Sequence, residues 1–168
     1  MATTIRLERP GDAPAIAAVV RTAFAGARHR SGTEAAIVAA LRAAGALTLS
    51  LVASEDGDLV GHVAFSPVTV DGRAVGWFGL GPVAVRPDRQ GGGIGQALIR
   101  EGLDRLRRLG AAGCVVLGAP GFYARFGFVT DAGLRYGGAP PEYFQRLAFT
   151  GGPPPAGEVA YHPGFAAE

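Results

Sequence analysis

Apolar residues near the amino end recur every four positions, which is the period of an amphipathic helix. Ile16, Val20 and Phe24 share one face in this way, and Asp12 stands before them as a candidate N-cap. Residues 5–7 precede the helix and have the apolar character of a short strand. We therefore expect the chain to open with a strand followed by a helix.

A second helix is predicted directly after the first. Ser31 and Glu34 have the spacing of a capping box, in which each side chain bonds to the backbone of the other residue. Apolar residues continue to Leu41, and Gly45 is a natural residue for ending a helix. The two helices should form one layer.

From residue 47 the apolar positions alternate with polar ones, and this period of two is typical of strands. Asp-Gly pairs at 56–57 and 71–72 favour tight two-residue hairpins. Further strands are therefore expected over 59–70 and 74–85, and the three strands should form an antiparallel meander.

The third strand of this meander is interrupted by Gly79, Gly81 and Pro82. Glycine weakens a strand, and proline lacks the N–H group that a ladder needs. We therefore predict a bulge or an unpaired stretch near Gly81.

A third helix is predicted over residues 95–109, with Gly110 as the residue that ends it. Its outer face carries two pairs of opposite charge four residues apart, Glu101 with Arg105 and Asp104 with Arg108. Its buried face is expected to hold Ile99, Leu103, Leu106 and Leu109.

The rest of the chain alternates short elements with glycine and proline. We expect a strand over 114–117, a short helix over 120–126, and a last strand over 159–161 after a Gly/Pro-rich break at 151–155. This order of elements predicts a mixed α/β (α+β) fold in a single domain over residues 1–168.

Composition narrows the possible chemistry. Hydrophobic residues make up 48% of the 168 residues, which excludes a disordered chain. All 16 basic residues are arginine, so the chain has no lysine for a P-loop or for a pyridoxal phosphate Schiff base. A net charge of +2 fits a small anionic ligand better than nucleic acid.

Cysteine and histidine are too few and too scattered to indicate a metal centre. Cys114 is the single cysteine, and His29, His62 and His162 lack the spacing of zinc ligands. The amino end is charged by its sixth residue, and no apolar stretch is long enough to span a membrane. We expect a cytoplasmic protein that uses no metal.

The candidate chemistry lies between the third strand of the meander and the following helix. Residues 91–95 are four glycines and one isoleucine, so their backbone N–H groups are accessible at the positive end of a helix. A pyrophosphate fits such a loop, although a flexible glycine-rich turn would have the same composition. A Rossmann loop is excluded because its third glycine position holds Gln96 or Leu98.

The loop Gln90-Gly-Gly-Gly93-Ile-Gly95 resembles the acetyl-CoA loop of the GCN5-related N-acetyltransferases, Gln/Arg-x-x-Gly-x-Gly/Ala. The resemblance extends to the segment 59–67 and to Phe122-Tyr-Ala-Arg-Phe-Gly-Phe128. It implies a central, mostly antiparallel, splayed sheet flanked by helices. It also implies that an acetyl group moves directly from acetyl-CoA to a primary amine.

The same resemblance implies roles for individual residues. The strand residues Val83, Ala84 and Val85 would bind the pantetheine arm as an added strand does, and the Val83 N–H would stabilise the oxyanion. Tyr123 would protonate the departing thiolate. The alternative is that Tyr123 serves only as a packed aromatic residue. The pyrophosphate would lie on the loop, with Gln90, Gly91, Gly92, Gly93, Ile94, Gly95 and Gln96 as its binding residues.

The sequence does not identify the group that would deprotonate the amine. The strand 74–85, where relatives often carry a glutamate, has no ionisable residue. Glu34 and His62 are the two candidates, but Glu34 could serve only the capping box and His62 could be a core residue. We expect proton removal through water and backbone carbonyls, with Glu34 or His62 assisting.

Two other functions stay open, a non-catalytic acyl-CoA-binding or sensing module and an arginine-rich nucleic-acid-binding domain. Two of the three arginines Arg105, Arg107 and Arg108 have a carboxylate partner four residues away, which favours a solvated helix face. The segment Arg28-His29-Arg30 could attract an acidic acceptor or the cofactor, or could be a solvated loop. The expected partners are acetyl-CoA and an unidentified amine, without nucleic acid or membrane. The protein would act as a monomer or homodimer.

Overall fold

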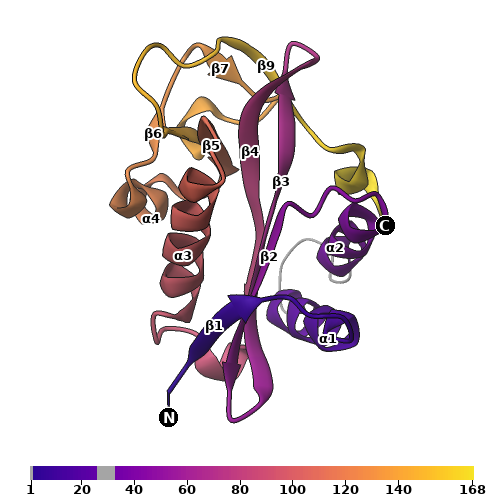
Figure 1. The fold of residues 1–168 in the computed structure, drawn as a ribbon. Coiled ribbons are helices and arrows are strands. Elements are labelled where there is room, and N and C mark those ends of the chain that lie inside the picture. The colour runs from indigo at the N-terminus through magenta and orange to yellow at the C-terminus, as the bar shows by residue number, and fades with distance from the viewer. Residues whose placement is uncertain (1, 26–32) are drawn as a thin grey trace.

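The computed structural model describes residues 2–25 and 33–168, which form a central sheet with helices on both faces (Figure 1). The strands and helices in chain order are β1 (Thr4–Leu7), α1 (Ala13–Phe24), α2 (Thr33–Ala43), β2 (Leu49–Glu55), β3 (Asp58–Val70), β4 (Arg73–Val85), α3 (Ile94–Arg108), β5 (Gly113–Leu117), α4 (Pro120–Tyr123), β6 (Val129–Thr130), β7 (Leu134–Arg135), β8 (Phe144–Ala148) and β9 (Gly157–Tyr161). Short 3-10 turns occur at Pro87–Arg89, Ala124–Phe126, Pro141–Tyr143 and Pro163–Ala166.

The sheet is mostly antiparallel, as expected. Its main path runs in the order β1-β2-β3-β4-β5-β8-β6, and within this path β4 and β5 run parallel while the other pairs run antiparallel. Strand β9 returns from the end of the chain to pair with the carboxyl end of β3, and β7 pairs with β9.

The predicted hairpins form at both Asp-Gly pairs. Asp56 and Gly57 have φ angles of 52° and 84°, and Asp71 and Gly72 have φ angles of 50° and 78°. Positive φ at both central residues is the signature of the turn type that matches the twist of a hairpin. The antiparallel meander β2-β3-β4 is therefore confirmed.

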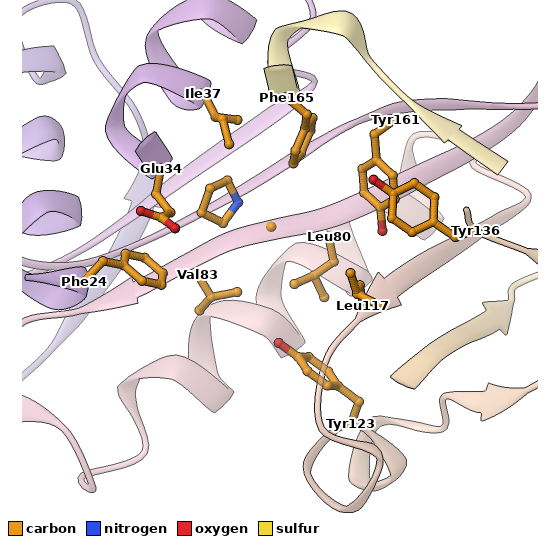
Figure 2. A pocket seen from close by; sticks show the side chains of 12 residues that line it. Phe24, Glu34, Ile37, Leu80, Val83, Leu117, Tyr123, Tyr136, Tyr161 and Phe165 are labelled. Carbon is orange, nitrogen blue, oxygen red and sulfur yellow. The ribbon is translucent and has the colours of Figure 1, made fainter. Parts of the chain in front are cut away.

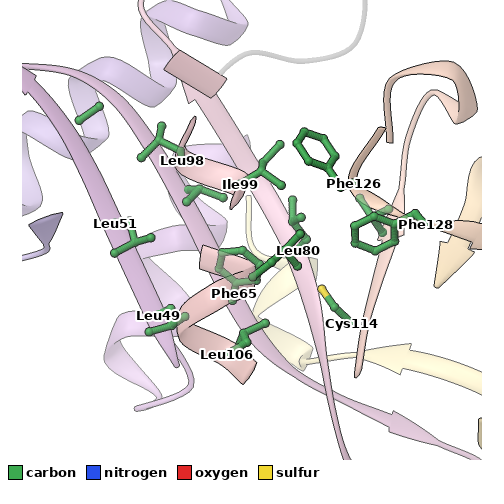
Figure 3. Packing of buried hydrophobic residues seen from close by; sticks show 14 of the residues in the cluster. Leu49, Leu51, Phe65, Leu80, Leu98, Ile99, Leu106, Cys114, Phe126 and Phe128 are labelled. Atoms are coloured by element: carbon green, nitrogen blue, oxygen red, sulfur yellow. The ribbon is translucent and has the colours of Figure 1, made fainter. Parts of the chain in front are cut away.

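Helix α3 covers one face of the sheet, and α1 and α2 cover the other (Figure 1). The larger core lies under α3, where Phe65, Leu98, Leu106 and Phe128 are buried together (Figure 3). A separate cluster of buried apolar residues joins α1 and α2 to the sheet. Because both faces are covered, β2 is buried along both sides rather than alternating between core and solvent.

The structure confirms most of the features predicted for α3. The Ala111 N–H bonds to the Leu106 carbonyl, and Gly110, with a φ angle of 88°, bonds to the Arg107 carbonyl. This arrangement satisfies carbonyls that the end of a helix leaves without partners. Both predicted ion pairs form. Leu109 contradicts the prediction, because it is 65% exposed at the C-cap rather than buried.

The amino half and the carboxyl end match the sequence predictions only in part. Asp12 occupies the N-cap position of α1 as predicted, but its carboxylate accepts hydrogen bonds from Arg6 and from the Arg9 N–H and none from the helix. Ser31 lies outside the described residues, so the capping box does too. The sequence pattern missed β6, β7 and β8, and β8 supplies the antiparallel neighbour of β5.

Gly102→Ala should destabilise the fold, although alanine favours helices more than glycine does. A Cβ at Gly102 would overlap the Phe65 ring, so α3 would have to move away from β3. We expect a loss of about 1–3 kcal/mol in the free energy of unfolding, measured by urea denaturation. Gly95→Ala in the same helix should be neutral or stabilising, because its Cβ meets Val85 at an ordinary 3.6 Å. Equal losses in the two variants would contradict this packing.

Candidate active site

An extra residue in β4 opens the sheet at its centre. Leu80 pairs with Phe65 and Val83 pairs with Val63, so β4 uses one residue more than β3 over the same distance. This is the predicted bulge, and Gly81 within it has a φ angle of 135°. Strand β5 pairs with β4 only over Trp77–Gly79, so the two parallel strands separate immediately before the bulge.

Beyond the bulge, some backbone groups of β4 face the side away from β3. The Arg86 N–H donates to the Val60 carbonyl at 2.8 Å, and bonded and non-bonded pairs alternate in an antiparallel ladder. The backbone groups of Val83 and Val85 therefore point toward the open edge. The backbone of Ala84 is used by β3, so Ala84 does not belong with the other predicted binding residues at this edge.

The glycine loop forms a small cavity at the start of α3. Gly93 is the N-cap with a φ angle of 88°, and the first turn of α3 contains no acidic residue. The cavity has a volume of about 220 Å³ and is lined by Val85, Arg89, Gln90, Gly91, Gly93, Ile94, Gly95, Gln96 and Phe122. Of the predicted loop residues, Gly92 alone does not line it. The unpaired N–H groups of a helix N-terminus and its positive dipole favour an anion here.

Side chains around the loop are already engaged with one another. The Arg86 guanidinium bonds to Asp88 at 2.8 Å, and Arg89 bonds to Glu55 at 2.6 Å. The Gln90 amide donates to the Val85 carbonyl at 3.0 Å, which agrees with the outward orientation of that carbonyl. An anion in this cavity would therefore be held mainly by backbone N–H groups.

A larger cavity of about 380 Å³ lies where β4 and β5 separate (Figure 2). Its walls come from α1, α2, β4, β5, the α4 turn and the carboxyl-terminal segment. It is lined by Phe24, Glu34, Ile37, Leu80, Gly81, Pro82, Val83, Leu117, Tyr123, Tyr136, Tyr161 and Phe165. Val83 and Tyr123 line this cavity while their neighbours Val85 and Phe122 line the smaller one. The edge of β4 therefore connects the two cavities.

Tyr123 directs its hydroxyl group into the larger cavity (Figure 2). Its ring packs edge-on against Phe122 and Phe128, with centroids 5.0 and 5.9 Å away. A Cβ at Gly118 would overlap this ring, so glycine is needed there to seat it. Burial raises the pKa of the Tyr123 phenol above its usual value, so the hydroxyl keeps its proton at neutral pH.

Two polar atoms of this cavity lack hydrogen-bond partners among the described residues. They are the Oε1 atom of Glu34, at the start of α2, and the hydroxyl oxygen of Tyr161, at the end of β9. Buried polar groups in proteins are nearly always paired, so each of these atoms is a candidate to meet a ligand or a water molecule. Burial also raises the pKa of the Tyr161 phenol well above its usual value.

His62 lies outside both cavities, in a buried chain of polar groups. Its Nε2 atom is 2.8 Å from the Ser50 hydroxyl, which donates to Glu8 at 2.6 Å. Because that hydroxyl proton is used, Nε2 must carry a proton and donate to Ser50. Arg42 holds Glu8 from the other side and keeps the pKa of that carboxyl below its usual range. The site therefore brings Glu34, Val83 and Tyr123 together and leaves His62 apart.

Other candidate groups are spread over the described structure. Cys114 is fully buried in the larger hydrophobic core, and burial raises the pKa of its thiol. Within residues 2–25 and 33–168, His, Cys, Asp and Glu form no cluster of three that could hold a metal ion. No helix in these ranges is long and apolar enough to cross a bilayer.

Comparison with known proteins decides the family. The model of the acetyltransferase (GNAT) family matches residues 17–128. The chain belongs to the GNAT family of acetyltransferases. It is 47% identical over 125 residues to the uncharacterized N-acetyltransferase YhbS of Escherichia coli, covering 74% of this chain and 72% of that one.

Two solved structures that resemble this GNAT chain were determined in complex with acetyl-CoA or CoA. A GNAT family acetyltransferase from Brucella melitensis in complex with acetyl-CoA is 54% identical, with a TM-score of 0.88 over 98% of both chains. Escherichia coli YhbS in complex with CoA is 42% identical, with a TM-score of 0.88 over 97% of this chain and 91% of that one. The resemblance noted in the glycine loop is thus confirmed at the level of the whole fold.

Sequence reasoning missed most of the aromatic lining of this GNAT site. Tyr136, Tyr161 and Phe165 come from the segment after residue 128, where the last strand was the one element predicted. Phe122 precedes Tyr123 and lines the smaller cavity. The aromatic content of the carboxyl-terminal segment was the available signal, but its return to β3 depends on long-range pairing.

The stability of this GNAT fold should fall between pH 7 and pH 5 because His62 is buried in its neutral form. Burial lowers the pKa of His62 from 6.5 to about 4. The unfolded chain then takes up a proton in this range and the native state does not, so stability rises with pH. We expect about 2 kcal/mol less free energy of unfolding at pH 5 than at pH 7.

The measurement is urea denaturation at the two pH values, with the imidazole protons of His62 followed by NMR. A His62 titration near pH 6.5 in the native protein would contradict the assigned neutral state.

Proposed function

We propose that this protein transfers an acetyl group from acetyl-CoA directly to a primary amine, within a complex that contains both substrates. The observation that carries the proposal is the open edge of β4, which runs from the glycine loop to the larger cavity. A long donor with an anion at one end and a reactive acyl group at the other matches this layout. The protein would act in the cytoplasm as a monomer or homodimer, without nucleic acid or membrane as partner.

The residues of the chain fit the two ends of acetyl-CoA. Backbone N–H groups of Gly93, Ile94 and Gly95 lie at the N-terminus of α3, where a pyrophosphate would be stabilised. The outward backbone groups of Val83 and Val85 would pair with the pantetheine amides as an added strand would. What the bound donor supplies is an acetyl thioester, placed beside Val83 and Tyr123.

The groups around the larger cavity support acyl transfer chemistry. The Val83 N–H would donate to the carbonyl oxygen on which negative charge develops, as an oxyanion hole does. The amine nitrogen would bond to the carbonyl carbon while the bond from carbon to sulfur breaks. Tyr123 would give its proton to the sulfur, because a buried neutral phenol holds that proton at neutral pH.

Proton removal from the amine is assigned to water and backbone carbonyls, with Glu34 assisting. Glu34 lines the cavity, whereas His62 is enclosed and bonded to Ser50. An alkyl ammonium has a pKa of about 10.4, so only about one molecule in 10³ is free amine at neutral pH. The value of kcat/KM should therefore rise with pH.

Gly93→Asp should weaken acetyl-CoA binding by at least about 100-fold, because a carboxylate would stand where a phosphate must lie. Calorimetry with acetyl-CoA measures this directly. Gly110→Asp is the matched control, since Gly110 lies at the other end of α3 and has the same φ of 88°. Binding within about threefold of wild type in a folded Gly93→Asp protein would refute the pyrophosphate assignment.

Tyr123→Phe should lower kcat by about 10² to 10⁴ and leave acetyl-CoA affinity nearly unchanged, since the change removes the proton donor and keeps the ring. Steady-state kinetics with an accepted amine, together with calorimetry, separate the two quantities. Tyr143→Phe, at an exposed tyrosine outside both cavities, is the control. An unchanged kcat would remove Tyr123 from the reaction.

A further inference from the structure

The part of the larger cavity away from Val83 and Tyr123 has an unusually aromatic wall. Phe165 packs against Tyr161 with ring centroids 4.9 Å apart, and Tyr161 packs against Tyr136 at 5.0 Å. Ile37 of α2 lies beside Phe165, and Phe24 of α1 lies on the opposite side of the cavity (Figure 2). A ligand that passes between these walls would be enclosed by flat apolar surfaces.

One carboxylate interrupts this apolar lining. Glu34 is the single Asp, Glu, Arg or Lys among the described lining residues, and it lies near Phe24 (Figure 2). Its Oε1 atom is inaccessible to solvent and has no partner among the described residues. A cationic hydrogen-bond donor in the cavity would pair with this carboxylate, and a neighbouring aromatic ring would add attraction for the same cation.

The size of the cavity limits the acceptor further. Its volume of about 380 Å³ is near the lower end of ligand pockets, which range from roughly 300 to 1,000 Å³. A donor acetyl group must occupy part of this space. The remainder suits a small molecule with one amine and a body of about the size of an aromatic ring.

We propose that the acceptor is a small primary monoamine with an apolar, aromatic-sized body, its ammonium group at Glu34 and its body between Phe24, Ile37 and Phe165. The proposal rests on the proposed acetyl transfer and names the substrate class for it. A diamine would place a second charge against the aromatic wall, and burying a charge without a partner is unfavourable. An acceptor carboxylate near Glu34 would meet repulsion between like charges.

An acceptor panel with acetyl-CoA tests the substrate class. The probes are phenethylamine, the diamine putrescine and the dipeptide glycylglycine, compared by kcat/KM from thiol release and by product mass. We expect phenethylamine to exceed each of the other two by at least about 10-fold, a difference of about 1.4 kcal/mol. Phe165→Ala should reduce kcat/KM for phenethylamine by about 10-fold. The same variant should change kcat/KM for methylamine by less than about threefold.

The charge of Glu34 is tested by Glu34→Gln, which keeps the shape of the side chain. We expect kcat/KM for phenethylamine to fall by about 10- to 100-fold, because a hydrogen bond to a charged group is lost. For aniline, an aromatic amine that is uncharged at neutral pH, kcat/KM should fall by less than about threefold in the same variant. Equal losses for both amines would show a merely structural role for Glu34. Glu142→Gln, at an exposed glutamate outside both cavities, is the matched control.

The outcomes separate this inference from the proposed function. If the protein binds acetyl-CoA and acetylates putrescine or glycylglycine better than phenethylamine, the acceptor class is wrong and the acetyl transfer stands. If acetyl-CoA binds but calorimetry on the CoA-saturated protein detects no phenethylamine binding, the acceptor class is also wrong. If acetyl-CoA does not bind, the proposed function itself fails.

Discussion

The extra residue in β4 at Gly81 and Pro82 is the constraint on which the site depends. β4 continues to pair with β3 on one side of it, but its pairing with β5 ends at Gly79. A parallel neighbour along the whole of β4 would cover the backbone groups of Val83 and Val85. Their exposure beside a glycine loop and a helix N-terminus is what allows this edge to bind an extended ligand.

The opening is shaped by packing from both ends of the chain. Glycine at position 79 allows the Tyr161 ring to lie against β4, because a Cβ there would approach the ring to 2.5 Å. The 3-10 turn after β9 brings Phe165 next to Tyr161 and toward α2. On the same side, α2 contributes Glu34. The lining of one cavity thus comes from residues that are far apart in the sequence.

Local signals in the sequence predicted the parts of this site that depend on neighbouring residues. Asp-Gly pairs specified both hairpins, glycines 91–95 specified the loop, and the bulge followed from Gly81 and Pro82. The strands β6 and β7 were not predictable, because two-residue strands carry no period. The five-residue strand β8 was also missed, and it is held by pairing with the distant strand β5. His62 was ambiguous for a similar reason, since its burial is set by packing around β3 rather than by its neighbours in sequence.

The most direct test is a crystal structure of the protein with acetyl-CoA. We predict the pyrophosphate on the N–H groups of the loop at 91–95 and the pantetheine arm along the open edge of β4. The Val83 nitrogen should lie within about 3.2 Å of the thioester carbonyl oxygen, with the Tyr123 hydroxyl directed at the sulfur. A cofactor bound away from this edge, or a Val83 N–H that points into β3, would contradict the central role of the bulge.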